Sequence, residues 1–113
     1  MRVYVAAPWK RKQDAITSRW FEHPGDPNDC AGLTESVDEV RAQAAEDIYD
    51  VLSAEALVVL NLQQSEGKAV ETGIALMAQI PVISVGPRSN IFQTLGTEVA
   101  TVEEAIQVLD GIS

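Results

Sequence analysis

The sequence is short of the residue types that disulfides and most metal centres require. It contains one cysteine, Cys30, and one histidine, His23. An internal disulfide needs two cysteines, and structural zinc sites are built from clusters of cysteine and histidine. We therefore expect no disulfide and no metal centre, and we interpret Cys30 as a bystander. His23 opens a segment rich in proline and glycine, 23–29, which predicts an exposed loop in which a lone histidine is more often solvated than catalytic.

Positive charge and long apolar runs are also scarce. Eight basic residues stand against 17 acidic ones, a net charge of −9, which repels a phosphate polymer and argues against a nucleic-acid partner. No apolar run approaches the ~20 residues that cross a bilayer, and the chain starts with a strand pattern rather than a signal peptide. These features predict a soluble, cytoplasmic protein with no membrane partner.

The apolar residues that are present suffice for one core. They make up 46% of 113 residues, and a chain of this size buries roughly two-thirds of its unfolded surface. We find no internal repeat, low-complexity segment or linker. The sequence therefore predicts a single domain over residues 1–113.

Short apolar runs alternate with helical patterns along this domain. Alternation of this kind predicts an α/β fold, here a doubly wound, flavodoxin-like parallel sheet of five strands with helices on both faces. The expected strands are Arg2–Ala6, Ala15–Phe21, Leu57–Leu60, Ile80–Val85 and Thr97–Ala100. The expected helices are Glu35–Leu52, a segment from Ser65 to Ala78, and one that follows a capping box at Thr101–Glu104.

The first crossover is unusually short. Only about eight residues separate the first strand from Ala15–Phe21, against the dozen or so that a parallel crossover needs. Either the crossover is cut to one helical turn, or residues 10–21 are themselves the helix. We favour the strand with a shortened crossover.

The helix expected over Glu35–Leu52 carries one polar residue on its apolar stripe. Asp47 lies on this stripe or at its edge, and Thr34 or Ser36 is available as the N-cap. A carboxylate in such a place either has a hydrogen-bond partner or serves a chemical purpose. The first explanation is the more common one for an isolated residue of this kind.

The chain is organised around Ser65–Gly73, which joins an apolar strand to a helix. In parallel α/β sheets such junctions gather at the carboxyl edge, where ligands bind. Ser65 is the expected N-cap, and Gly67 leaves room for a ligand to approach the backbone. Gly73, inside the helix, costs about 1 kcal/mol relative to alanine, which suggests close packing or close approach. Glu71 lies about one turn into the helix, and its ionised carboxylate is either a nucleophile or a solvated surface group.

Most of the basic residues lie close to an end of an apolar run. Parallel strands would gather them at one edge, where a small anion such as phosphate could bind. The ordinary polarity of loops explains the pattern equally well. The residues concerned are Lys10, Arg11, Lys12, Arg19, Lys68 and Arg88.

Three segments resemble the nucleoside 2-deoxyribosyltransferase family, which includes deoxynucleoside 5′-monophosphate N-glycosidases. They are Tyr4–Pro8, Ala45–Ile48 and the S-x-G-x-x-x-E-x-G pattern of Ser65–Gly73. The resemblance covers nearly the whole chain. It implies an enzyme that cleaves the N-glycosidic bond of a 2′-deoxynucleoside or its 5′-monophosphate through a covalent deoxyribosyl-glutamate, without metal or organic cofactor. Water or a second base would take the sugar, and the sequence leaves hydrolase and transferase equally open.

The resemblance also implies the role of individual residues. Glu71 matches the nucleophile, Asp47 the residue that assists proton transfer to the departing base, and Tyr4 the residue that positions the nucleophile. Ser65 matches a phosphate-contacting serine. The family's sites also draw a polar side chain from a neighbouring subunit, which Ser89 or Asn90 would supply here, so a homodimer is implied. The other candidate substrate-binding residues are Gly67, Ala7, Pro8, Trp9, Lys10 and Arg88, and Trp9 and Trp20 are candidates to stack on the base.

The sequence departs from the family at two places. Glu55 stands where the family has aspartate, and the short first crossover changes the base pocket. This crossover permits a second function, a nucleotide-binding module of the same fold that lacks turnover. A Rossmann-type redox domain is a weaker alternative, because no G-x-G-x-x-G pattern follows the first strand.

Overall fold

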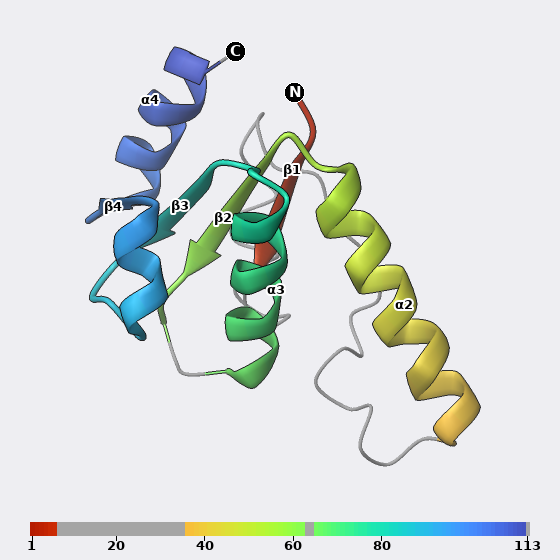
Figure 1. Cartoon of the computed structure of the whole chain (residues 1–113). Coiled ribbons are helices and arrows are strands. Elements are labelled where there is room, and N and C mark those ends of the chain that lie inside the picture. Colours follow the sequence, from red (N-terminus) through yellow and green to blue (C-terminus); the bar gives the residue numbers. More distant parts are fainter. Residues whose placement is uncertain (7–35, 63–64, 113) are drawn as a thin grey trace.

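A parallel sheet forms the centre of the molecule (Figure 1). The computed structural model describes residues 1–6, 36–62 and 65–112. In these residues the sheet has four strands, which lie side by side in chain order, and each neighbouring pair is parallel. The strands are β1 (Val3–Ala6), β2 (Ala56–Leu60), β3 (Val82–Val85) and β4 (Thr97–Val99).

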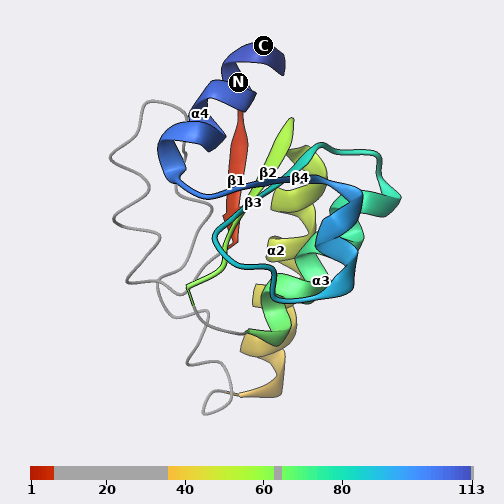
Figure 2. The ribbon, with the colours of Figure 1, turned by 90° about the vertical axis from the view of Figure 1, so that its left-hand side faces the viewer.

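Helices cover both faces of this sheet. Viewed from the side, α4 lies on one face, and α2 and α3 lie on the other (Figure 2). No helix of the described segments is long and apolar enough to cross a membrane. The helices are α2 (Val37–Ser53), α3 (Glu66–Met77), α4 (Val102–Ile112) and the short 3₁₀ helix η2 (Ile91–Leu95).

The core has two layers because successive side chains of a strand point to opposite faces. Every residue of β1, β2 and β3 is buried, as expected for parallel strands that are covered on both faces. In β1, for example, Val3 and Val5 pack toward Leu109 of α4, whereas Tyr4 and Ala6 pack in the second cluster with Val51 of α2. Tyr4 and Ala6 of β1 therefore lie on the face of the sheet that α2 and α3 cover.

Local signals at the helix starts are confirmed. The Ser36 hydroxyl accepts from the Glu39 backbone N–H at 3.3 Å and so caps α2. The capping box at the start of α4 also forms, since the Glu104 backbone N–H donates to the Thr101 hydroxyl at 3.1 Å. These contacts depend on residues three positions apart, so they can be recognised without knowledge of the fold.

One expectation needs correction. The sheet has four strands in the described residues instead of five, because the remaining expected strand, Ala15–Phe21, lies outside them. The alternative helix over 10–21, the shortened crossover, the loop at 23–29 and Cys30 also lie outside the described residues.

Among the described residues, the apolar stripe of α2 is buried only near its C-terminal end. Val51 is fully buried, whereas Val37 is 69% exposed and Ile48 is 44% exposed. The 17 residues of α2 make a helix about 25 Å long. Strands of four or five residues span only about 15 Å. The helix therefore extends past the carboxyl edge of the sheet (Figure 1).

Two glycines have opposite surroundings. A Cβ atom on Gly96 would lie 2.4 Å from the Val82 carbonyl oxygen, so only glycine lets the end of η2 approach β3. A Cβ atom on Gly73 would meet no atom of the described residues within 4 Å. Close packing within the chain, one of the two expected reasons for Gly73, is therefore not found among these residues.

We expect Gly96→Ala to lower the free energy of unfolding by about 1–3 kcal/mol, the usual cost of overpacking. Gly73→Ala should instead raise it by up to about 1 kcal/mol, because alanine is the better helix former. Urea denaturation of both variants tests this. An unchanged Gly96→Ala midpoint would contradict the close approach of η2 to β3.

Candidate active site

A tyrosine and a glutamate meet between the first strand and α3. The Tyr4 hydroxyl donates to the Glu71 carboxylate, with 2.5 Å between Oη and Oε2. Tyr4 is 2% exposed, and Glu71 is half-buried. The two residues are 67 positions apart, and they meet because α3 follows β2 and β2 pairs with β1. The structure thus brings together two residues that the family resemblance assigns to one site.

The helix that carries Glu71 begins at Glu66. Ser65 is the N-cap, and its hydroxyl accepts from the Lys68 backbone N–H at 3.4 Å. A Cβ atom on Gly67 would have the Ser65 hydroxyl oxygen as its nearest neighbour, at an ordinary contact distance of 3.6 Å. Among the described residues, the space at Gly67 is therefore open, and a group that binds helix N-terminal N–H groups could approach the first turn of α3 there.

Asp47 is half-buried on α2, the helix that packs beside α3. Its carboxylate accepts from the Gln43 side chain at 3.3 Å. Gln43, on the same helix, is thus a hydrogen-bond partner of the kind that a purely structural aspartate would have. It leaves the chemical role of Asp47 to be tested by substitution.

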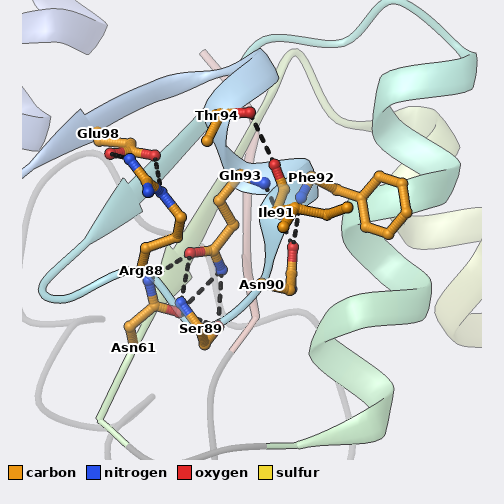
Figure 3. A network of polar contacts seen from close by, with 9 residues as sticks. All are labelled: Asn61, Arg88, Ser89, Asn90, Ile91, Phe92, Gln93, Thr94 and Glu98. Atoms are coloured by element: carbon orange, nitrogen blue, oxygen red, sulfur yellow. Dashed lines mark hydrogen bonds and ion pairs between the residues drawn. The ribbon is translucent and has the colours of Figure 1, made fainter.

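A buried glutamine organises the loop after β3 (Figure 3). Gln93 is 1% exposed and forms a reciprocal amide pair with Asn61, with bonds of 2.7 Å and 2.9 Å. The same glutamine accepts from the Ser89 backbone N–H at 3.1 Å and donates to the Ser89 hydroxyl at 3.0 Å. Because Asn61 directly follows β2, this network attaches the loop to the end of the neighbouring strand. The sequence predicts a role for neither amide, and its one signal for them is their place next to apolar runs.

Ser89 and Asn90 line a hollow with Ser65, but Glu71 does not. Asn90 caps η2 by accepting from the backbone N–H groups of Phe92 and Gln93. Ala69 of the hollow and Glu71 are two positions apart on α3, which places them on opposite sides of the helix. The hollow therefore lies across α3 from the Tyr4–Glu71 pair of the same chain. Its volume is about 310 Å³, and it is lined by Ser65, Glu66, Ala69, Ser89 and Asn90.

The two described cations of the expected anion site are engaged elsewhere. Arg88 forms a two-pronged ion pair with Glu98, at 2.7 Å and 2.9 Å, and its side chain points away from Ser89 and Asn90 (Figure 3). The hydrogen bond from Arg88 lowers the pKa of the Glu98 carboxyl, and the same contact raises the pKa of Arg88. Lys68 is buried against β2 and donates to the Leu60 carbonyl at 3.1 Å. Neither cation lines the hollow.

The remaining sequence candidates lie outside the described residues. They are Ala7, Pro8, Trp9, Lys10, Arg11, Lys12, Arg19 and Trp20.

Comparisons with known proteins bear on the fold. No family model and no curated protein matches the chain. Among solved structures, a conserved protein from Enterococcus faecalis V583 is similar, with a TM-score of 0.56 and 17% sequence identity over 94% of each chain. At this identity the likeness shows the fold alone. The chain is an α/β protein with a parallel sheet, in which a tyrosine of the first strand holds a glutamate of α3.

We expect Gln93→Ala to lower the free energy of unfolding by about 1–3 kcal/mol, because it removes both hydrogen bonds between the buried Gln93 and the half-buried amide of Asn61. Gln107→Ala is the matched control, since Gln107 is exposed on α4 and its truncation should cost under about 0.5 kcal/mol. Thermal or urea denaturation measures both. Equal losses would mean that the amide pair does not hold the loop.

Proposed function

We propose that this protein is an enzyme that cleaves the N-glycosidic bond of 2′-deoxynucleosides or their 5′-monophosphates, with Glu71 as the nucleophile. The observation that carries the proposal is the hydrogen bond between Tyr4 and Glu71. The resemblance relates these residues through two separate motifs. Their contact in the folded chain is an independent physical result that agrees with one site.

The first half-reaction would use Glu71 and Tyr4. A Glu71 oxygen attacks the anomeric carbon, a new C–O bond forms, and the electron pair of the breaking C–N bond goes to the base. The buried Tyr4 hydroxyl holds the Glu71 carboxylate through Oε2. The carboxylate therefore samples fewer orientations before it attacks the anomeric carbon. Because Tyr4 belongs to a buried strand, this orientation is rigid.

The departing base must also receive a proton. Asp47, on the neighbouring helix α2, is the proposed residue that assists this transfer. Its half-buried position places a carboxyl group beside α3, the helix that carries Glu71. In the second half-reaction water or another base attacks the glycosyl-enzyme, which regenerates Glu71 and yields a hydrolase or a transferase.

The substrate's 5′ end fits the start of α3, where Ser65 and the open backbone at Gly67 suit an oxygen-bearing group. Arg88 is paired with Glu98, and Lys68 is buried. The described cations therefore do not favour the monophosphate over the nucleoside, and both substrates belong to the proposal.

A flavodoxin-like sheet and a homodimer are parts of the same proposal. The four described strands correspond to the 1-3-4-5 portion of the order 2-1-3-4-5. In support of a dimer, α2 and α3 form an apolar groove of about 630 Å³ that includes Gly73. Two of its residues, Val70 and Met77, are 60% and 87% exposed. A second copy on this groove would explain the glycine, and Ser89 or Asn90 would then serve the partner's site.

We expect the protein to release free base from at least one 2′-deoxynucleoside or 5′-monophosphate, measured by chromatography with and without an acceptor base. Glu71→Gln should lower this rate at least about 10³-fold while the protein still binds substrate. Glu103→Gln, an exposed glutamate of α4, is the control and should keep the full rate. A deoxyribosyl adduct in the intact-protein mass that is absent from Glu71→Gln would support the covalent step. Substrate binding without base release by the wild type would indicate the binding module instead.

We expect Asp47→Asn to slow base release about 10²–10⁴-fold, the usual contribution of a positioned proton donor, with little change in binding. Asp38→Asn, which alters an aspartate of α2 whose side chain is 96% exposed, should retain the wild-type rate. The opposite pattern, a lowered melting temperature with normal turnover, would make Asp47 a structural residue.

A further inference from the structure

A buried lysine occupies the first turn of α3. Lys68 is 4% exposed, although lysine is among the residues least often buried. A helix N-terminus also disfavours positive charge. Burial lowers the pKa of Lys68, which is a further sign that the site opposes the charge. Conflicts of this kind between a residue and its surroundings occur mainly at functional or strained positions.

Lys68 makes three hydrogen bonds, of which one joins α3 to the sheet and two lie within the start of α3. Its ammonium donates to the Leu60 carbonyl, the last of β2, at 3.1 Å. Its backbone N–H donates to the Ser65 hydroxyl at 3.4 Å, and its carbonyl accepts from the Thr72 hydroxyl at 2.7 Å. The first turns of α3 are thus attached to the end of β2 through this one residue.

Glu71 follows Lys68 by one helical turn. Residues three apart on a helix have Cβ atoms about 5–6 Å from each other. Glu71 reaches Tyr4 of β1, and Lys68 reaches Leu60 of β2. These strands are hydrogen-bonded neighbours, about 4.8 Å apart. One turn of α3 is therefore held to two adjacent strands: the Glu71 carboxylate contacts β1, and the Lys68 ammonium contacts β2.

Among the described residues, the other buried or half-buried ionisable groups near α3 are acids or a phenol. In the described elements that pack against α3, the buried or half-buried titratable residues are Tyr4 in β1 and Asp47 and Asp50 in α2, whereas β2, β3 and η2 contain none. Asp50 pairs with Arg2 at 3.8 Å. On α3 itself Glu66 is exposed. Lys68 is thus the cation of this described group, next to the carboxylate that would have to be ionised to react.

We propose that Lys68 is a positioning residue for Glu71: its ammonium holds the turn that carries Glu71 against β2 and keeps the neighbouring carboxylate charged. An opposite charge within about 4–6 Å favours the ionised form of a carboxyl group. The catalytic consequence rests on the proposed function. The effect on the charge state of Glu71 can be measured without any substrate.

The test compares variants that remove the charge with one that does not. Lys68→Met keeps the length and the apolar stem of the side chain, and Lys68→Gln keeps a donor for the Leu60 carbonyl, so at least one neutral variant should fold. Thr72→Val is the matched control, because it removes a bond to the backbone of Lys68 and leaves the charge in place.

The main readout is the titration of the Glu71 carboxyl carbon by ¹³C NMR, assigned by its loss in Glu71→Gln. Removal of a nearby cation destabilises the carboxylate, so the pKa of Glu71 should rise by about one unit in Lys68→Met and Lys68→Gln. Thr72→Val should leave this pKa unchanged. With an active enzyme, the acid limb of the pH profile for base release should move upward by the same amount. The rate well below that limb should then fall about tenfold in the neutral variants.

Each result separates the two proposals. An unchanged pKa of Glu71 in a folded neutral variant, or an equal shift in Thr72→Val, overturns the role of Lys68 even if the enzyme releases base. If the pKa of Glu71 rises in the Lys68 variants but the wild-type protein releases no base, the role of Lys68 stands and the proposed function is overturned.

Discussion

The hydrogen bond between Tyr4 and Glu71 is the interaction on which the arrangement of the site depends. A phenol that is buried in a strand must find an acceptor, because an unsatisfied buried hydroxyl costs about 1–3 kcal/mol. Glu71 meets this need from α3, 67 positions along the chain. The contact defines how α3 sits over β1, and it removes the rotational freedom of the carboxylate. The same bond therefore serves both the stability of the fold and the proposed chemistry.

The first turns of α3 combine features that are unfavourable for stability alone. Lys68 is a buried cation at a helix N-terminus, and Gly73 lies inside α3 although a Cβ atom there would meet no atom of the described residues within 4 Å. A sequence optimised only for folding would replace both. Their presence around Glu71 is consistent with selection for a site, with Lys68 acting on charge and Gly73 lining the groove proposed for a second copy.

The carboxyl edge is rigid on the side of β3 and β4. The Asn61–Gln93 amide pair attaches the loop after β3 to β2, and the Arg88–Glu98 ion pair attaches it to β4. Residues that bind or react are commonly carried by loops that such a scaffold holds. Because these contacts also occupy Arg88, the rigidity is gained at the expense of the cation that would otherwise attract a phosphate.

Local patterns in the sequence determined the α/β class, the strands β1 to β4, the helices α2 to α4 and the caps at Ser65 and Thr101, because each depends on residues a few positions apart. For the start of α2 they offered both Thr34 and Ser36, and the structure places Ser36 there. The family resemblance pointed to Tyr4 and Glu71 before any contact was known. Only the tertiary structure decided that these two side chains touch, that Arg88 pairs with Glu98, and that Lys68 is buried. These outcomes depend on which strands become neighbours and on how far α2 extends past the sheet, and a linear pattern of residues does not contain that information.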